Sequence, residues 1–409
     1  MRILFFDWDE FNGADCRDAM KRLGHHVDTF KLNMEGYDLT PKIDKAIREK
    51  ALQTCNDEGN EHNGSDGNSD KRYYDLLFSF DYFPNISEAC QKYGMPYVSW
   101  VFDCPHYTLD SHTINNEVNR VYLFDRKLFM NMVKKGVKTV RYSPLGVNEK
   151  RLSEFCENLD AETGGNIVYE HDVCFLGSLY DNEYNFYDQV KYLPPYLKGY
   201  VDAVIKAQER IFGEDLFTEP SIINNDHIRE LREYIKFEDT GKYDIDYDNV
   251  MLDILRKKVT VNERHEILRQ MGKRFDTVLY TGPGAKPIEG VCNLGVADYM
   301  KKMPRVFHRS KINFNITLRS ILSGVPLRVL DILAAGGFLI TNYQEEIAEY
   351  FVDGEDLAIA YTPEDMIRLT QYYLEHEEER KHIAINGQSK VYELFAYTKL
   401  LPNILNIYS

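Results

Sequence analysis

The sequence lacks the features of a secreted, membrane-spanning or disulfide-stabilised protein. Its 409 residues include seven cysteines, an odd number with no CxxC pair and no cluster with histidine, which argues against a disulfide framework. No apolar run approaches the roughly 20 residues that cross a bilayer. The first ten residues carry Arg2, Asp7, Asp9 and Glu10, and so lack the apolar run of a secretory signal. We therefore expect a cytoplasmic protein with reduced thiols and no transmembrane segment.

Positive charge is also scarce. Lys and Arg number 49 against 65 Asp and Glu, which gives a net charge of -16 at pH 7. Such a surface repels phosphate backbones, so we do not expect nucleic acid as a partner. The hydrophobic share of 44% and the aromatic share of 13% are typical of a globular chain, and 409 residues exceed one ordinary core. The composition predicts a folded protein with two domains.

The first 145 residues alternate between short apolar runs and helical segments, which is the pattern of a parallel sheet covered by helices. Residues 3–6 and 27–30 predict strands on either side of a helix at 15–23, which Gly24 ends. Further strands are expected at 75–80, 97–102, 121–124 and 139–142. The polar segment 53–72 is interpreted as a mobile loop. This half is predicted to be a doubly wound α/β domain.

A second strand and helix series follows Pro144-Leu145-Gly146-Val147-Asn148, which we interpret as the boundary between domains 1–148 and 149–395. Its strands are expected at 172–176, 277–280, 311–316, 338–341 and 357–361. Residues 184–264 lack strand character and predict a helical insertion in the second domain, and 396–409 is expected to form a helix that returns to the first. The predicted fold class is α/β, with two doubly wound Rossmann-like domains facing a cleft where ligands bind.

The segment Gly324-Val325-Pro326-Leu327-Arg328-Val329-Leu330-Asp331 carries a specific chemical signal. Pro326 lies near the first helical position of a largely apolar helix, and Gly336-Gly337 ends it. Arg328 and Asp331 share one face near the amino-terminal end, where free N–H groups and the helix dipole attract anions. A pyrophosphate beside Arg328 and ribose hydroxyls beside Asp331 would suit this arrangement. Taken alone, the pair is better interpreted as an ordinary i,i+3 ion pair worth ~0.2–0.5 kcal/mol, and only the surrounding motifs reverse that preference.

An ordered set of motifs resembles a known family. Leu23-Gly24-His25-His26-Val27 resembles the turn at the second strand of GT-B glycosyltransferases, and Ser143-Pro144-Leu145-Gly146-Val147-Asn148 resembles their linker. The stretch 311–391 is similar to group 1 glycosyltransferases of the spore-maturation CgeB-like type, through Ile312-Asn313-Phe314-Asn315-Ile316 and the Pro326 helix. The resemblance covers both halves of the chain but not the insertion.

The resemblance implies a GT-B glycosyltransferase that moves a hexose from a uridine diphosphate (UDP) sugar to an acceptor hydroxyl, with no metal or other cofactor required. Asp331 matches the family's ribose-binding acid, where glutamate is commoner. Ser323 stands where retaining members carry a glutamate that binds the donor sugar, so the stereochemical outcome stays open. The acceptor would be a glycan, a protein or a small molecule. The donor side is expected to include Gly177, Ser178, Asn315, Arg319, Arg328 and Asp331.

The acceptor side is expected on the first domain. Trp100-Val101-Phe102-Asp103-Cys104-Pro105-His106 ends an apolar strand with an acid and an imidazole. Asp103 is the first candidate and His106 the second for taking the proton of the acceptor hydroxyl, because burial tunes a carboxylate and histidine titrates near neutrality. A structural role, such as capping the next loop, is equally open. Asn12 and Gly13, which follow the first strand, are also expected to line the acceptor side.

Three other interpretations stay open. Asp7-Trp8-Asp9 after an apolar strand resembles the nucleophile motif of haloacid dehalogenase phosphatases, which use Mg²⁺, although the downstream Lys and paired Asp motifs are missing. Asp244-Ile245-Asp246 matches the metal-binding DxD of GT-A transferases, but no strand leads into it, and a solvated acidic turn is preferred. A protein that binds a nucleotide sugar without turnover is the third, since fold alone does not establish function.

Overall fold

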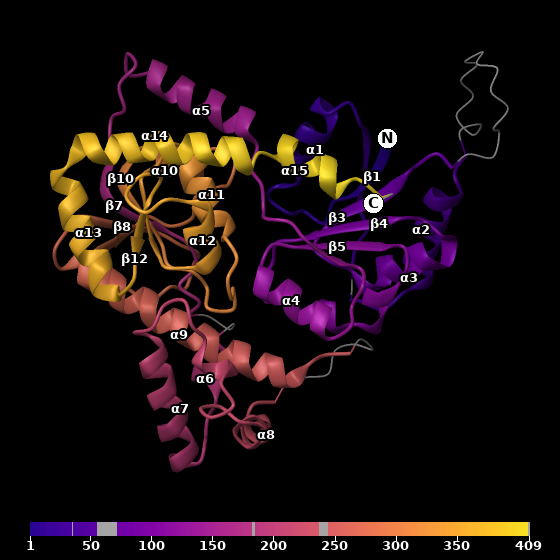
Figure 1. Ribbon diagram of the computed structural model, residues 1–409, viewed down its shortest axis with the longest axis horizontal. Coiled ribbons are helices and arrows are strands. Elements are labelled where there is room, and N and C mark those ends of the chain that lie inside the picture. The colour runs from indigo at the N-terminus through magenta and orange to yellow at the C-terminus, as the bar shows by residue number, and fades with distance from the viewer. Residues whose placement is uncertain (35, 55–71, 182–184, 237–243, 408–409) are drawn as a thin grey trace.

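The computed structural model describes residues 1–34, 36–54, 72–181, 185–236 and 244–407. It contains two α/β domains, each built on a six-stranded sheet in which all paired strands are parallel (Figure 1). The predicted fold class, two doubly wound Rossmann-like domains, is confirmed. Most of the segment 53–72, which we interpreted as a mobile loop, lies outside the described residues.

The first sheet has the strand order β2-β1-β3-β4-β5-β6. Its strands are β1 (Arg2–Phe6), β2 (His26–Phe30), β3 (Leu76–Phe80), β4 (Tyr97–Val101), β5 (Asn119–Leu123) and β6 (Val140–Tyr142). The helices between them are α1 (Gly13–Arg22), α2 (Pro41–Leu52), α3 (Pro84–Tyr93) and α4 (Arg126–Lys134). The strand order reverses between β1 and β3, and a doubly wound sheet binds its ligand at such a switch point.

The second sheet has the order β12-β11-β10-β7-β8-β9. Its strands are β7 (His171–Leu176), β8 (Thr277–Tyr280), β9 (Val291–Asn293), β10 (Ser310–Asn315), β11 (Leu339–Asn342) and β12 (Ala358–Ala360). Its helices include α10 (Lys302–His308), α11 (Leu327–Ala334), α12 (Glu345–Tyr350), α13 (Pro363–Glu375) and α14 (Glu377–Leu394). The order reverses between β7 and β10, so the carboxyl ends of these two strands mark the second switch point.

The strands predicted from sequence are found within two residues of their expected ends, because buried parallel strands are continuous apolar runs. Gly24 ends α1 with a φ of 84°, the left-handed conformation that glycine adopts without steric cost. β9 was not predicted. It is a short, largely exposed edge strand containing Cys292 and Asn293, so it lacks the apolar run that marked the others.

The chain passes twice between the domains. It leaves the first through α5 (Glu149–Ala161) and returns through α15 (Tyr397–Ile404), which lies beside α1 (Figure 1). The two passes are joined where Val147 N–H donates to the Phe395 carbonyl at 2.9 Å and Tyr397 N–H donates to the Val147 carbonyl at 2.9 Å. One cluster of buried apolar side chains continues from β1 in the first domain to α11 in the second.

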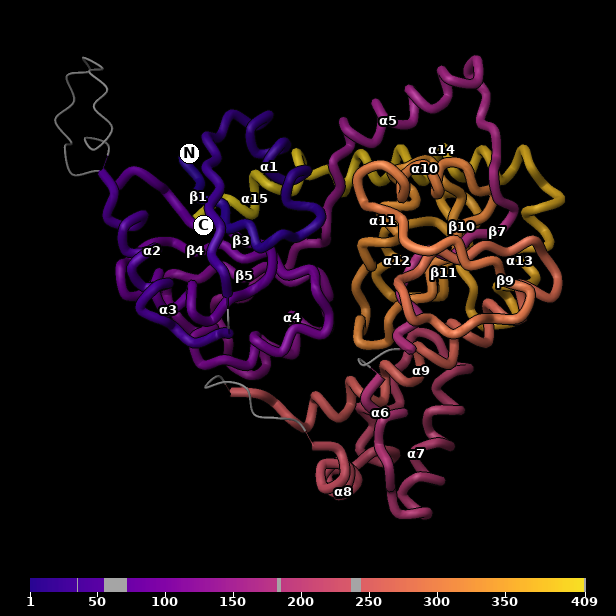
Figure 2. Tube along the Cα trace, turned by 180° about the vertical axis from the view of Figure 1, so that it is seen from behind, coloured from indigo at the N-terminus to yellow at the C-terminus, as the bar shows by residue number. Residues whose placement is uncertain are grey.

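Between β7 and β8 the chain forms a helical lobe that projects away from both sheets (Figure 2). The lobe comprises α6 (Phe186–Gln189), α7 (Pro195–Gln208), α8 (Asn225–Tyr234) and the 26-residue α9 (Tyr247–Gly272). α9 does not stop near residue 264, where we placed the end of the insertion. It continues beneath the second sheet, where Ile267, Leu268 and Met271 are buried, so one helix belongs to both the lobe and the domain. No helix in the described part of the chain is long and apolar enough to span a membrane.

Candidate functional site

Helix α11 follows β10 and is the helix that the glycine and proline pattern predicted. Pro326 has φ -62° and ψ 144° and precedes the first helical residue, Leu327. Val329, Leu330 and the following residues up to Ala334 are buried, so the helix is held in the core of the second domain. Its amino-terminal end lies at the carboxyl edge of the second sheet, where a doubly wound domain binds its ligand.

Asp331 is a buried acid with few partners. Its side chain is 4% exposed, and its carboxylate receives a long hydrogen bond from the Tyr299 hydroxyl at 3.4 Å. Arg328 Nη1 lies 3.9 Å from Asp331 Oδ2, but it comes closer to the sulfur of Met303, at 3.0 Å. Burial raises the pKa of Asp331 to about 6, against the lowering effect of Arg328 and Arg151. The ion pair is therefore loose, and the carboxylate retains the capacity to accept further hydrogen bonds.

A second arginine, Arg264, interacts electrostatically with Arg328. Arg264 of α9 donates to the Ile316 carbonyl at 2.6 Å and also bonds the Ser178 carbonyl, which holds the turn after β7. Burial lowers the pKa of Arg264, and repulsion from the charge of Arg328 lowers it further. A Cβ at Gly177 would lie 3.3 Å from the Phe175 ring, so glycine keeps this turn close to the sheet. The turn after β7 is thus held by Arg264, whose charge interacts with that of Arg328, the neighbour of Asp331 on α11.

Two residues expected on the donor side have other partners. The guanidinium of Arg319 forms an ion pair with the buried Glu263 of α9 and lies 5.0 Å from the centre of the Phe212 ring. These two contacts join the loop after β10 to the helical lobe. It borders a cavity of about 460 Å³ between α4, the lobe and the second domain. Asn315 is buried and donates to the hydroxyls of Thr317 and Thr341, both at 2.9 Å. Both residues therefore organise the ends of β10 and β11.

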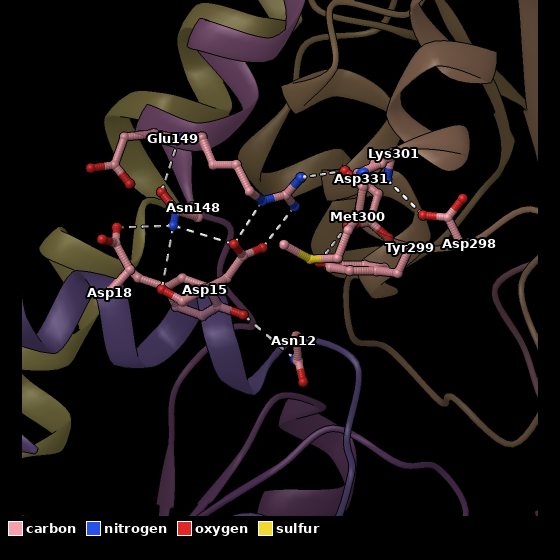
Figure 3. A network of polar contacts seen from close by, with 12 residues as sticks. Asn12, Asp15, Asp18, Asn148, Glu149, Asp298, Tyr299, Met300, Lys301 and Asp331 are labelled. Atoms are coloured by element: carbon pink, nitrogen blue, oxygen red, sulfur yellow. Dashed lines mark hydrogen bonds and ion pairs between the residues drawn. The ribbon is translucent and has the colours of Figure 1, made fainter. Parts of the chain in front are cut away.

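A polar network connects Asp331 with the first domain (Figure 3). Arg151 of α5 donates to both carboxylate oxygens of Asp15 in α1, at 2.6 and 2.7 Å. The same guanidinium donates to the Met300 carbonyl at 3.2 Å and lies 5.6 Å from the ring of Tyr299, the residue that bonds Asp331. The network ties the surroundings of Asp331 to α1. Sequence analysis missed it, because Asp15 and Arg151 are separated by 136 residues.

The domains also meet at Asp125, a residue that sequence analysis did not identify. Its fully buried carboxylate caps α4 through Leu128 N–H at 2.9 Å. The same carboxylate accepts the backbone N–H groups of Leu322, Ser323 and Gly324 in the second domain, at 2.5, 3.0 and 3.3 Å. The backbone just before α11 is therefore bound to an acid of the first domain.

Asp125→Ala is expected to lower the free energy of unfolding by about 3–5 kcal/mol, because it leaves buried backbone N–H groups without an acceptor, and each such group costs about 1–3 kcal/mol. Urea denaturation followed by circular dichroism measures the change. Glu345→Ala is the matched control: its partner Lys127 also crosses the domain interface, at 3.0 Å, but both side chains are over 40% exposed. The control should change stability by less than about 1 kcal/mol. Equal losses in the two variants would contradict this role of Asp125.

Two carboxyl groups lie together at the carboxyl edge of the first sheet. Asp81 follows β3 and is 2% exposed, and its Oδ1 accepts the backbone N–H groups of Phe102 and Asp103 at 3.0 and 3.1 Å. Burial raises the pKa of Asp81 to about 7, and burial together with the charge of Asp81 raises the pKa of Asp103 to about 6. Two neighbouring carboxyl groups ionise in two coupled steps. The pair therefore releases protons close to neutral pH, which suits general base catalysis.

His106 is held by residues of two loops, those that follow β3 and β4. Its Nε2 lies 3.1 Å from Tyr82 N–H and 2.8 Å from the Thr108 hydroxyl. Burial lowers the pKa of His106, which favours the neutral ring. The same nitrogen also lies 3.1 Å from the Tyr82 carbonyl, so the tautomer of the ring decides whether it accepts or donates. These contacts tie the loop that carries Asp103 and His106 to the loop after β3.

Asn12 and Gly13 lie at the start of α1, on the same edge. Asn12 is 2% exposed and its amide nitrogen lies 3.5 Å from the Tyr397 hydroxyl, while its Oδ1 has no hydrogen-bond partner among the described residues. A Cβ at Gly13 would lie 1.7 Å from Glu10 Oε1, so only glycine allows Glu10 to fold back here. Asn12 can still meet a ligand, whereas Gly13 serves the packing of its neighbour.

Asp7 and Asp246, the acids of the phosphatase-like and DxD motifs, each form an ion pair with a cationic side chain. Asp7 lies 3.3 Å from Arg17 Nη1 and 3.4 Å from Lys31 Nζ, cations that would oppose a Mg²⁺ ion at this carboxylate. Asp246 accepts Asn249 N–H at 3.1 Å as the cap of α9 and lies 3.0 Å from Lys135 Nζ. Both acids are thus engaged in interactions that stabilise the fold, which disfavours the phosphatase and GT-A interpretations.

Part of the chain matches a protein family, and its fold is similar to solved structures. A family model described as glycosyl transferase-like matches residues 261–406, which contain Arg264, Arg328 and Asp331. Among solved structures, sucrose-phosphate synthase from Thermosynechococcus elongatus is similar with a TM-score of 0.50 and 10% identity, over 100% of this chain and 98% of that one. An α-glucosyltransferase crystallised with UDP and a 13-mer DNA has a TM-score of 0.50 and 10% identity, over 100% and 99%. No curated protein sequence matches significantly.

At 10% identity the structural similarity concerns the fold, while the family match concerns the second domain. The chain therefore has the two-domain GT-B fold, and its residues 261–406 are similar to the glycosyl transferase-like family.

Proposed function

We propose that this protein is a glycosyltransferase that moves a hexose from a UDP-sugar to an acceptor hydroxyl without a catalytic metal. One observation carries the proposal: a buried, sparsely bonded acid, Asp331, lies one turn along α11 from Arg328, and both lie within the stretch that matches a glycosyl transferase-like family. The non-catalytic nucleotide-sugar-binding protein is the competing candidate, because it needs the same donor site.

The donor is bound by the second domain in this proposal. Asp331 accepts hydrogen bonds from the ribose hydroxyls, and Arg328 and Arg264 neutralise the diphosphate from the side of Gly177 and Ser178. Charge that develops on the departing UDP is stabilised by these fixed cations and by the helix dipole, which need no rearrangement during the reaction. Uridine is the proposed base because the α-glucosyltransferase of similar fold was crystallised with UDP.

The acceptor is bound by the first domain. Asp103, with Asp81 beside it, takes the proton of the attacking hydroxyl. The network from Asp331 through Tyr299 and Arg151 to Asp15 is proposed to hold the two domains together around the substrates, since a closed site excludes water, the competing acceptor.

A thermal-shift panel of nucleotide sugars, run with Mg²⁺ and again with a chelator, tests the donor and the metal. We expect a UDP-sugar to raise the melting temperature equally in both conditions, since a ligand at 100 times its Kd stabilises by about 2.7 kcal/mol. Stabilisation that requires Mg²⁺ would contradict metal independence, and the absence of any response would contradict the donor site. Release of UDP only when an acceptor is added separates a transferase from a binding protein.

A further inference from the structure

The switch point of the first sheet carries an aromatic patch, which we define as Trp8, Phe11 and Phe102. Trp8 follows β1, and its indole N–H donates to the Phe80 carbonyl at the end of β3 at 3.1 Å, so it spans the reversal in strand order. The rings of Trp8 and Phe102 are nearly parallel, at 12°, with centroids 6.2 Å apart. Phe11 packs against Phe102 at 5.5 Å and is 47% exposed. The patch thus presents aromatic surface where this type of sheet binds its ligand.

The aromatic patch leads from the carboxyl pair to the proposed donor site. Phe102 immediately precedes Asp103, and its backbone N–H bonds Asp81. At the other end, Phe11 lies 4.7 Å from the ring of Tyr299, whose hydroxyl bonds Asp331. A molecule lying on the patch would therefore be next to the candidate base and would face the second domain.

Buried polar atoms beside the patch lack hydrogen-bond partners. Asp81 Oδ2 and Asn12 Oδ1 have no hydrogen-bond partner among the residues that the structure describes, and Glu10 Oε1 has only a distant ion pair with Arg17 Nη1, at 3.7 Å. Asp81 and Asn12 are each 2% exposed, and an unsatisfied buried polar atom costs about 1–3 kcal/mol. All three atoms are hydrogen-bond acceptors. The ligand that suits them is one that presents several hydroxyl donors.

The charge of this edge restricts the ligand further. Two cations, Arg17 and Lys31, face the acids that gather here. The acids are Asp7, Asp9, Glu10, Asp81 and Asp103. Like charges about 4 Å apart repel by about 4 kcal/mol near a protein surface, so an added phosphate or carboxylate would be disfavoured. The ligand is therefore expected to be uncharged.

We propose that the aromatic patch and the Asp81–Asp103 pair bind an uncharged saccharide as the acceptor. The inference rests on the proposed function and narrows its acceptor to one class. A sugar ring stacks its C–H face on the negative face of the aromatic rings, and its hydroxyls donate to the unpartnered acceptors. In the transfer, the acceptor oxygen bonds the anomeric carbon, the bond from that carbon to the diphosphate breaks, the electron pair leaves with UDP, and the acceptor proton passes to Asp103.

The test measures binding of neutral methyl hexosides, as gluco, galacto and manno probes, and of their 6-phosphates, by saturation-transfer NMR and calorimetry in the presence of UDP. We expect at least one neutral hexoside to bind and its 6-phosphate to bind at least about tenfold more weakly, which corresponds to about 1.4 kcal/mol. Trp8→Leu and Phe102→Leu should each weaken binding of the neutral hexoside by about tenfold and leave UDP binding unchanged.

Tyr192→Leu is the matched control, because it removes a 61% exposed aromatic ring from the helical lobe, and it should alter neither ligand. Tighter binding of the 6-phosphates, binding that survives both Trp8→Leu and Phe102→Leu, or no binding of any neutral hexoside would overturn the inference. These outcomes leave UDP binding intact, whereas failure of UDP to bind the wild-type protein would overturn the proposed function itself. Circular dichroism melts of each variant separate loss of binding from loss of fold.

Discussion

Replacing Asp331 by alanine is expected to weaken UDP binding by at least about 100-fold while the protein stays folded, because charge-assisted hydrogen bonds to two ribose hydroxyls contribute about 1.5–3 kcal/mol each. The acid is suited to this role, since it is buried at the carboxyl edge of the second sheet and its bond from Tyr299 is long, at 3.4 Å. Isothermal calorimetry with UDP measures the change. Unchanged affinity would remove the central residue of the proposed donor site.

Asp331→Asn separates binding from stability. Burial raises the pKa of Asp331 from 3.8 to about 6, so its contribution to stability is present below pH 4 and is lost as pH rises through 6. Asparagine does not ionise. At pH 8 the variant should therefore be more stable than the wild type by about 2–3 kcal/mol, with the difference vanishing near pH 4, and it should still bind UDP poorly.

Glu375→Ala is the control for both measurements, because Glu375 is an exposed acid at the end of α13. It should change neither UDP affinity nor the pH dependence of urea denaturation. If Asp331→Asn were less stable than the wild type at pH 8, the burial argument for Asp331 would be wrong even where the binding result held.

Asp103→Asn should reduce turnover by about 10²–10⁴-fold, the usual contribution of a general base, while UDP binding is retained. The reason is that only an ionised Asp103 takes the acceptor proton, and asparagine cannot. A coupled enzymatic assay that detects UDP, run in the presence of the acceptor, gives the initial rates and therefore the size of the effect. Undiminished turnover would show that Asp103 is not the base.

The pH profile distinguishes a base from a residue that only shapes the site. The pKa of Asp103 is raised to about 6 and that of Asp81 to about 7, so the wild-type rate should rise with pH across this range as the pair loses protons. Asp81→Asn removes the charge that opposes ionisation of Asp103. The rise should then move to lower pH. A rate that is flat between pH 5 and 8 in both proteins would contradict the assignment.

The sequence was a good guide to the elements of both sheets, because buried parallel strands are short apolar runs bounded by glycine, proline or polar residues. It failed at β9, an edge strand with little apolar content, and at the end of α9. That helix shows no break at residue 264, because the lobe and the second domain bury successive parts of it. The spacing of hydrophobic residues predicts that a helix is buried, but it does not show whether the helix packs against the lobe or against the second domain.

Site residues divide in the same way. Arg328 and Asp331 could be identified because one helix brings them together three residues apart. Asp125 could not, since its partners on the second domain lie 197 to 199 residues away and any acid before a helix looks like an ordinary cap. Arg264 was hidden in a segment that appeared to be an insertion. Arg319 was predicted to face the donor, but its guanidinium is paired with Glu263, a contact with no local signal in the sequence.

By itself the sequence determined the two doubly wound domains, the helix that carries Asp331 and the acid at the end of β4, because these depend on apolar periodicity and on residues close together in the chain. Only the tertiary structure decided which acids share a site. It brought Asp81 to Asp103 and Asp125 to the backbone before α11, and it brought His106 to Tyr82 in the loop after β3. The physical reason is that a pKa, an ion pair or an aromatic patch depends on distance in space and on burial, and neither is fixed by separation along the chain.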